Sequence, residues 1–300
     1  MAIGGYNMKL HAINPHFGSA PSSCALEKPT KFHWSLFDGD VRVYCENGHE
    51  SLLPNHLDST KKNFLWLCES PMVDYHLFGN LRGRLWNDKD LANSFDAIFT
   101  CEDEVLNRFP NSYFAPTGSN YPWTAKEHWG VHKKNKLISA LSSPKIFTPG
   151  HRERIKKIKM FDDEFFKSTG EPIDCFGGVN NSPKIGEGDF VNSWPGKEKA
   201  LKGYAFSIVI ENVEIDKYYT EKITDCFAMG TIPIYAGTRR ICEDFNCDGI
   251  LWYDDIFRDK IPISMDLYMS KLNAVKDNYE RVRQLKISDD YLFDAMEKFL

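Results

Sequence analysis

The segment from Phe206 to Gly237 constrains the fold of this chain more than any other part of the sequence. It opens with a short, mostly apolar run over residues 206–210, which is typical of a strand buried on both faces of a sheet. Thr220 then precedes a helical pattern as a candidate N-cap, and Gly230 follows that pattern as a candidate C′ residue. Residues 231–234 predict a second strand. The order strand, loop, helix, strand predicts a βαβ unit, which binds ligands at the carboxyl ends of its strands.

Charged and polar residues gather where such a unit would hold a ligand. Glu211 and Asn212 close the first strand, and Glu221 and Lys222 occupy the first turn of the helix. A helix N-terminus carries about half a positive charge and unpaired N–H groups, so it favours an anion such as a diphosphate. Lys222 would add a full positive charge there. Taken singly, these residues also fit a solvated helix end and a simple turn.

The spacing of these residues resembles the donor-binding signature of the family 10 glycosyltransferases, the α-1,3/1,4-fucosyltransferases. The matching positions are Glu211, Asn212, Tyr218, Thr220, Glu221, Lys222, Gly230, Pro233 and Gly237. Three positions depart from the family pattern: Ile210, Val213 and Tyr219. Val213 removes a hydroxyl near the expected nucleotide. The departure leaves the base and the sugar open without weakening the case for a diphosphate.

The resemblance implies a role for each charged or polar residue of the signature. It implies that Lys222 stabilises the leaving diphosphate during catalysis. It implies donor binding by five residues: Glu211, Asn212, Tyr218, Thr220 and Glu221. Glu211 has an alternative role, which is to orient the loop from behind.

A second match lies in the first half of the chain. Residues 64–68 predict another buried strand, which ends at Glu69-Ser70-Pro71. Members of the resembled family carry a similar Glu at this place, often as Glu-Ser-Pro. The resemblance therefore implies that Glu69 is the general base, while the position at a strand end only permits it.

A third match supplies a cation. Residues 137–141 predict a strand, and a helix is expected to run to about Lys167. In the family, an Arg between these elements contacts the donor diphosphate. Arg154 is the preferred candidate because of its position at the helix start, and Arg152 is the alternative. Either Arg could instead pair with a nearby carboxylate such as Asp162.

The resemblance implies an α/β architecture of the GT-B type, with two Rossmann-like domains facing across a cleft. We expect an acceptor-binding domain over residues 1–135 and a nucleotide-sugar donor-binding domain over residues 136–285. Residues 286–300 predict a C-terminal helix, which we expect to pack back on the first domain. The charged segment 129–135 is interpreted as the linker.

Asp38-Gly39-Asp40 has the D-x-D spacing of a metal-binding motif, whereas the cysteines form no C-x-x-C pair and have no His at zinc-finger spacing. D-x-D motifs hold Mn²⁺ or Mg²⁺ on a diphosphate in another glycosyltransferase architecture. A hairpin turn is favoured here because the βαβ unit already supplies an anion site. We therefore expect no metal and no cofactor beyond the donor substrate.

Net charge, hydropathy and cysteine content restrict the binding partners and the cellular compartment that the sequence predicts. The net charge of −5 argues against nucleic acid as the main partner, since phosphate-backbone binding needs a basic face. No segment approaches the ~20 apolar residues of a membrane span, and the N-terminal stretch lacks the apolar run of a signal peptide. Most of the eight cysteines lie in apolar surroundings and are expected to be reduced core residues, which favours a reducing, intracellular compartment. Together these features predict a cytoplasmic location. Animal members of the resembled family carry a membrane anchor, so the resemblance implies the soluble bacterial or viral type.

The resulting hypothesis is an inverting fucosyltransferase in glycan biosynthesis or protein glycosylation. It would transfer L-fucose from GDP-fucose to a glycan hydroxyl, with Glu69 as base and with Lys222 and Arg154 at the diphosphate. One alternative is a GT-B transferase that uses a different nucleotide sugar. Another is a non-catalytic carbohydrate-binding protein on the same fold. The acceptor, the linkage and the oligomeric state stay open at the level of the sequence.

Overall fold

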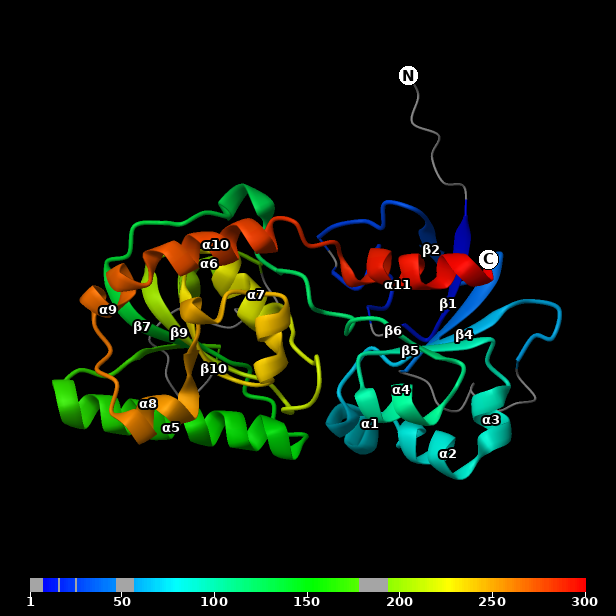
Figure 1. Cartoon of the computed structure of the whole chain (residues 1–300), viewed down its shortest axis with the longest axis horizontal. Helices are drawn as coiled ribbons and strands as arrows, with labels where there is room; N and C mark the ends of the chain where they lie inside the picture. The colour runs from blue at the N-terminus through cyan, green and yellow to red at the C-terminus, as the bar shows by residue number, and fades with distance from the viewer. Residues whose placement is uncertain (1–7, 16, 25, 47–56, 178–193) are drawn as a thin grey trace, which may run out of the picture. The chain divides into compact units, whose positions relative to one another are not determined.

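The computed structural model describes residues 8–15, 17–24, 26–46, 57–177 and 194–300, with side chains from residue 197 onward in the last range. The residues at the extreme N-terminus, which bear on the signal-peptide prediction, lie outside these ranges. The chain divides into two compact units (Figure 1). The first comprises Met1–Tyr121, Ile215–Tyr218 and Lys286–Leu300, and the second comprises Pro122–Glu214 and Tyr219–Leu285.

A six-stranded parallel sheet forms the centre of the first unit, with the strand order β2-β1-β3-β4-β5-β6. Its strands are β1 (Lys9–Ile13), β2 (His33–Ser35), β3 (Val41–Cys45), β4 (Asn63–Trp66), β5 (Ala97–Thr100) and β6 (Ser112–Phe114). The central strands are buried along their length, as expected of a parallel sheet covered on both faces.

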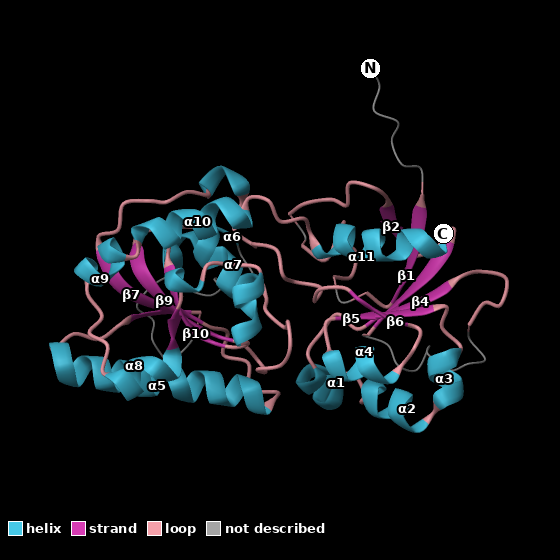
Figure 2. Cartoon of the chain, viewed as in Figure 1, coloured by secondary structure: helices cyan, strands magenta, loops and turns pink. Residues whose placement is uncertain are grey.

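Helices cover both faces of this sheet (Figure 2). The helices are α1 (Pro71–Leu77), α2 (Leu81–Asn87), α3 (Lys89–Asn93), α4 (Asp103–Arg108) and α11 (Ser288–Met296). Alternation along β4 divides the core: Phe64 and Trp66 pack with α11, whereas Leu65 packs with α2, α3 and α4. The C-terminal helix α11 is therefore part of the first unit's core.

The second unit contains a five-stranded parallel sheet with the order β11-β10-β9-β7-β8. Its strands are β7 (Lys136–Leu141), β8 (Asp174–Phe176), β9 (Tyr204–Ile210), β10 (Ile232–Ala236) and β11 (Leu251–Trp252). Its helices are α5 (Pro149–Thr169), α6 (Trp194–Leu201), α7 (Glu221–Ala228), α8 (Tyr253–Asp259), α9 (Met265–Ser270) and α10 (Leu272–Val282).

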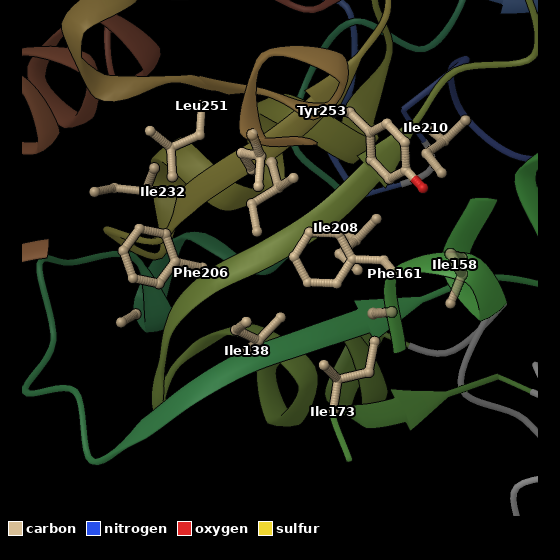
Figure 3. Close-up of a cluster of buried hydrophobic side chains, with 14 of the residues drawn as sticks. Ile138, Ile158, Phe161, Ile173, Phe206, Ile208, Ile210, Ile232, Leu251 and Tyr253 are labelled. Atoms are coloured by element: carbon tan, nitrogen blue, oxygen red, sulfur yellow. The ribbon is translucent and has the colours of Figure 1, made fainter. Parts of the chain in front are cut away.

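These helices also pack on both faces of their sheet (Figure 2). Figure 3 shows one layer of the core, in which Ile158 and Phe161 of α5 and Tyr253 of α8 lie against apolar side chains of β7, β9 and β10. On the other face, residues of α6 and α7 pack with Val209 and Tyr235. The central strand β9 is buried at every residue. Within the described part of the chain, no helix is both long and apolar enough to cross a membrane.

The βαβ unit predicted from residues 206–237 is confirmed. β9, α7 and β10 occur in that order, and Thr220 caps α7 through its side chain, which accepts a hydrogen bond from Lys222 N. Gly230 adopts a φ of 62°, a left-handed conformation that favours glycine after a helix. Its added Cβ would also lie 2.7 Å from Val131 Cα, so a side chain has no room there.

The segment interpreted as a linker is fixed to the second unit rather than extended between units. Gly130 N donates a hydrogen bond to Ala228 O, and the Lys134 ammonium donates to Met229 O and to the Thr231 hydroxyl. These contacts explain why the compact units divide after Tyr121 rather than after residue 135. Burial lowers the pKa of Lys134 to about 7.

Asp38-Gly39-Asp40 does not form the hairpin turn expected from the sequence. β1 lies between β2 and β3 in the sheet, so the segment connects two strands that are not neighbours. Asp40 accepts a hydrogen bond from Lys9 N, and the Lys9 ammonium lies 3.2 Å from the Asp38 carboxylate. A Cβ on Gly39 would lie 2.5 Å from His11 N. The segment therefore packs on the backbone of β1, which the sequence pattern did not reveal.

Most of the cysteines are free and buried, as expected, and two of the eight are oxidised. Cys242 and Cys247 form a disulfide within the second unit. Six others are free and buried: Cys24, Cys45, Cys68, Cys101, Cys175 and Cys226. The bonded pair is separated by five positions in the sequence, a spacing that is not one of the common metal or redox motifs.

Candidate functional site

The end of β9 and the start of α7 are joined by the Glu211 carboxylate. Its side chain is fully buried and accepts hydrogen bonds from Thr220 N and from the Thr220 hydroxyl, each at 2.9 Å. The Lys222 ammonium lies 3.2 Å from the same carboxylate. Of the two roles considered for Glu211, this geometry fits orientation of the loop from behind.

Lys222 is the most accessible of the charged groups at this end of α7. Its side chain is 23% exposed, compared with 11% for Glu221 and 0% for Glu211. The Lys222 Nζ donates to the Thr220 hydroxyl at 2.7 Å and lies 3.8 Å from Glu221 Oε1. The ammonium is thus held at the helix N-terminus by its neighbours while part of it still faces solvent.

Glu221 belongs to a buried ionic cluster that sequence reasoning missed. Lys197 Nζ lies 3.5 Å from Glu221 and 2.6 Å from Asp225. Although burial opposes it, the charges of Lys222 and Lys197 lower the pKa of Glu221. Asp225 also accepts a hydrogen bond from Trp123 N at 2.6 Å. No short spacing signals this cluster, because Lys197 lies 28 positions before Asp225.

The first turn of α5 lies directly against the residue that follows Glu211. A Cβ added to Gly150 would lie 2.1 Å from Asn212 O and 3.1 Å from Asn212 Cα. Only glycine permits this approach. Thr148 caps the helix: its hydroxyl accepts from His151 N, and His151 Nδ1 accepts from Thr148 N, both at 3.2 Å. Two helix N-termini, those of α5 and α7, therefore meet at the carboxyl end of β9.

The two candidate arginines differ in placement. Arg154 is buried, with its guanidinium 3.4 Å from Asn212 Oδ1 and 3.3 Å from the Ser143 hydroxyl. Arg152 is exposed on α5 and donates to Ile146 O at 2.9 Å. Of the pair, Arg154 points to the end of β9. Asp162, the carboxylate named as an alternative partner for either arginine, accepts a hydrogen bond from Ile173 N.

His151 responds to the electrostatic field at this point. Its pKa is lowered to about 4, first by burial and then by four cations: Arg154, Lys145, Lys222 and Arg152. Nearby positive charges disfavour the protonated form of His, so its pKa falls. The start of α5 is therefore a region of positive potential, which suits an anionic ligand.

Glu69 lies beyond β4 in the first unit and is partly exposed. Ser70 is the N-cap of α1 and Pro71 its first helical residue, a sequence signature of a helix start. Glu69 N donates to the Glu46 carboxylate at 2.9 Å, and Arg82 donates to Glu69 O at 2.7 Å. Tyr218 is buried and belongs to the short segment Ile215–Tyr218, which groups with the first unit.

Comparisons with known proteins place these observations in context. No family model matches the chain. It is 27% identical over 153 residues to an α-(1,4)-fucosyltransferase of Arabidopsis thaliana, a match covering 49% of this chain and 35% of that protein. It is 42% identical over 50 residues to the α-(1,3)-fucosyltransferase FucT of Helicobacter pylori, covering 17% of this chain and 10% of that protein. The matches thus span about a third or less of each relative.

Solved structures extend the likeness to nearly the whole chain. An α1,3-fucosyltransferase crystallised with GDP aligns over 97% of this chain and 94% of its own, with a TM-score of 0.55 and 15% identity. Another α1,3-fucosyltransferase structure aligns over 91% and 82%, with a TM-score of 0.51 and 16% identity. The predicted α/β class and the GT-B fold are confirmed. The chain therefore resembles the α-1,3/1,4-fucosyltransferases in sequence, as its donor-binding signature indicates, and has their GT-B fold.

Proposed function

We propose that this protein is an inverting glycosyltransferase that transfers L-fucose from GDP-fucose to a hydroxyl group of a glycan. One observation carries the proposal: the N-termini of α5 and α7, with Arg154 and Lys222, meet at Glu211-Asn212. This is where a parallel α/β sheet binds its ligand. Unpaired helical N–H groups and two cations suit the diphosphate of a nucleotide sugar.

The same groups would assist departure of the nucleotide. As the bond between the anomeric carbon and the phosphate oxygen breaks, its electron pair stays on the GDP leaving group. A cation at about 4 Å stabilises this charge by on the order of 4 kcal/mol at an effective dielectric near 20, before desolvation is subtracted. Lys222 and Arg154 would supply two such cations, so the proposed site needs no divalent metal.

The acceptor side of the reaction is assigned to the first unit. Glu69 would accept the proton of the acceptor hydroxyl as its oxygen bonds to the anomeric carbon. Attack on the face opposite the departing GDP inverts the configuration in one displacement. Asn212, Thr220 and Tyr218 are proposed to contact the donor. Glu211 is proposed to hold Lys222 and the loop, which leaves its carboxylate unavailable to the sugar.

The relatives support the donor and the sugar. Two proteins with local sequence similarity are named fucosyltransferases, and a protein with the same fold was crystallised with GDP. The Val213 departure is the reason to test other nucleotides alongside GDP.

A thermal-shift series with GDP, GDP-fucose, UDP, ADP and CMP, without added metal, tests the proposal. A ligand at about 100 times its dissociation constant adds roughly 2.7 kcal/mol to the free energy of unfolding. We expect GDP and GDP-fucose to raise the midpoint and the others not to. If only UDP raises the midpoint, the donor is a UDP-sugar rather than GDP-fucose. If no nucleotide raises it, the proposal that the protein is a glycosyltransferase is wrong. Product NMR of the new glycosidic bond then tests inversion.

A further inference from the structure

A buried ionic cluster in the first unit surrounds the backbone of Glu69. Its centre is Arg82, on α2, which is 8% exposed. The Arg82 guanidinium contacts three carboxylates: Glu46 beyond β3, Asp74 on α1 and Glu102 at the N-cap of α4. Each of these carboxylates is also buried. The cluster thus joins four segments at the carboxyl side of the sheet, where Glu69 leaves β4.

Two members of the cluster hold Glu69 by its main chain. Glu46 Oε2 accepts from Glu69 N at 2.9 Å, and Arg82 Nη2 donates to Glu69 O at 2.7 Å. Glu46 and Arg82 also pair directly with each other through Oε1 and Nη1. Because the N–H and the carbonyl of one residue are both fixed, the direction of its Cα–Cβ bond is fixed as well. The pair therefore sets the direction in which the Glu69 side chain leaves the backbone.

General stabilisation does not by itself account for such a cluster. Removing charges from water costs several kcal/mol for each ion, and apolar replacements of buried ion pairs are often as stable. The same cost acts on Glu46: burial raises its pKa to about 8, and the charge of Arg82 opposes the rise. A group kept in so unfavourable a place is a candidate for positioning a functional residue.

We propose that Glu46 and Arg82 are positioning residues for Glu69, acting through its backbone and not through the substrate. The inference rests on the proposed function, because it requires Glu69 to be the base. It extends that function by naming what holds the base in place. A carboxylate at the acceptor hydroxyl must be held closely, since a misplacement of about 1 Å can lower a rate by about 100-fold.

A double-mutant cycle tests the proposal on the full-length protein. Glu46→Gln keeps the shape of the side chain, but an amide cannot accept from both Glu69 N and Arg82. We expect it to lower kcat for transfer from GDP-fucose to a glycan acceptor, followed as GDP release, by about 10- to 100-fold. GDP affinity, measured by calorimetry, should not change, because the candidate anion site lies in the second unit. In a Glu69→Gln background, Glu46→Gln should change the residual rate by less than about twofold.

A matched control separates positioning from loss of stability. Asp289 is another fully buried carboxylate of the first unit, whose hydrogen bonds go to Ser23 and Trp34. Asp289→Asn should lower the melting temperature and leave kcat per folded molecule unchanged. Arg82→Lys, which keeps the charge but loses the forked donors, should lower kcat as Glu46→Gln does. If Arg82→Lys does not fold, the Glu46→Gln cycle still decides.

The outcomes distinguish failure of the inference from failure of the proposed function. If Glu69→Gln keeps full activity, Glu69 is not the base and both fail together. If Glu69→Gln is inactive but Glu46→Gln has the wild-type kcat, the positioning role alone is overturned. The same conclusion follows if the effects of Glu46→Gln and Glu69→Gln multiply, because independent residues behave in that way.

Discussion

Gly150→Ala gives the most direct test of the site in the second unit. The substituted Cβ would lie 2.1 Å from Asn212 O and 2.9 Å from Asn212 C. Both are backbone atoms at the end of β9, so no side-chain rotation relieves the overlap. An ordinary contact of about 3.5 Å requires the two backbones to separate by about 1.4 Å. That shift would move the first turn of α5, and Arg154 with it, away from the end of β9.

The size of the effect follows from the shift. A displacement of this order corresponds to a loss of about 100-fold in kcat if α5 positions the leaving group. Overpacking lowers the free energy of unfolding by about 1–3 kcal/mol, and the higher helix propensity of Ala offsets up to about 1 kcal/mol of that. GDP affinity should also fall, because the first turn of α5 would lie farther from the end of β9. Calorimetry measures the GDP affinity, GDP release from GDP-fucose measures kcat, and urea unfolding measures the free energy of unfolding.

Gly39→Ala is the matched control for Gly150→Ala. Its Cβ would also meet backbone, 2.5 Å from His11 N, but in the first unit. We expect a comparable loss of stability with normal GDP affinity. If Gly150→Ala binds GDP and turns over like the wild type, the close approach of α5 to β9 has no part in the site, and the argument from the two helix N-termini is wrong.

Three other predictions concern the cations and the histidine of the same site. Lys222→Met should lower turnover by about 100- to 1000-fold, with the protein still folded; near-normal turnover would remove Lys222 from the mechanism. Arg154→Gln should lower turnover by at least about tenfold, whereas Arg152→Gln on the same helix should not, and equal effects would refute the choice between them. The pKa of His151 falls from 6.5 to about 4 on folding, so the unfolded state binds more protons between these values. Stability should drop as the pH decreases from about 6.5 to about 4, by up to roughly 3 kcal/mol, and His151→Gln should show a flatter profile in urea unfolding at each pH.

The βαβ core could be predicted because several local signals agree over residues 206–237. An apolar run, a Thr N-cap and a Gly after the helix each fix one boundary, and all three were found in place. Asp38-Gly39-Asp40 had only local turn chemistry to guide its interpretation. Whether a turn joins neighbouring strands depends on the strand order in the sheet. Here β1, which precedes both strands in the sequence, lies between β2 and β3. A local turn pattern therefore could not show which strands this segment connects.

The site was predictable to the extent that its residues are close in sequence. Thr220 and Lys222 sit in one helical turn, so their proximity follows from helix geometry. Arg154 and Asn212 are 58 positions apart, and only the packing of α5 on β9 joins them. The clusters around Lys197 and Arg82 have no short motif at all. Such clusters depend on burial, which makes unpaired charge costly and is not visible in spacing.

Spacing also could not assign roles within the signature. Glu211 and Lys222 are both charged and both match the family pattern, yet one carboxylate is fully buried while the ammonium remains 23% exposed. A group can stabilise a leaving diphosphate only if ligand can approach it, so accessibility favours Lys222 for that task. Glu211, bonded to Thr220 and adjacent to Lys222, instead fixes the direction of the ammonium. We therefore expect Glu211 to orient the ammonium and Lys222 to contact the substrate.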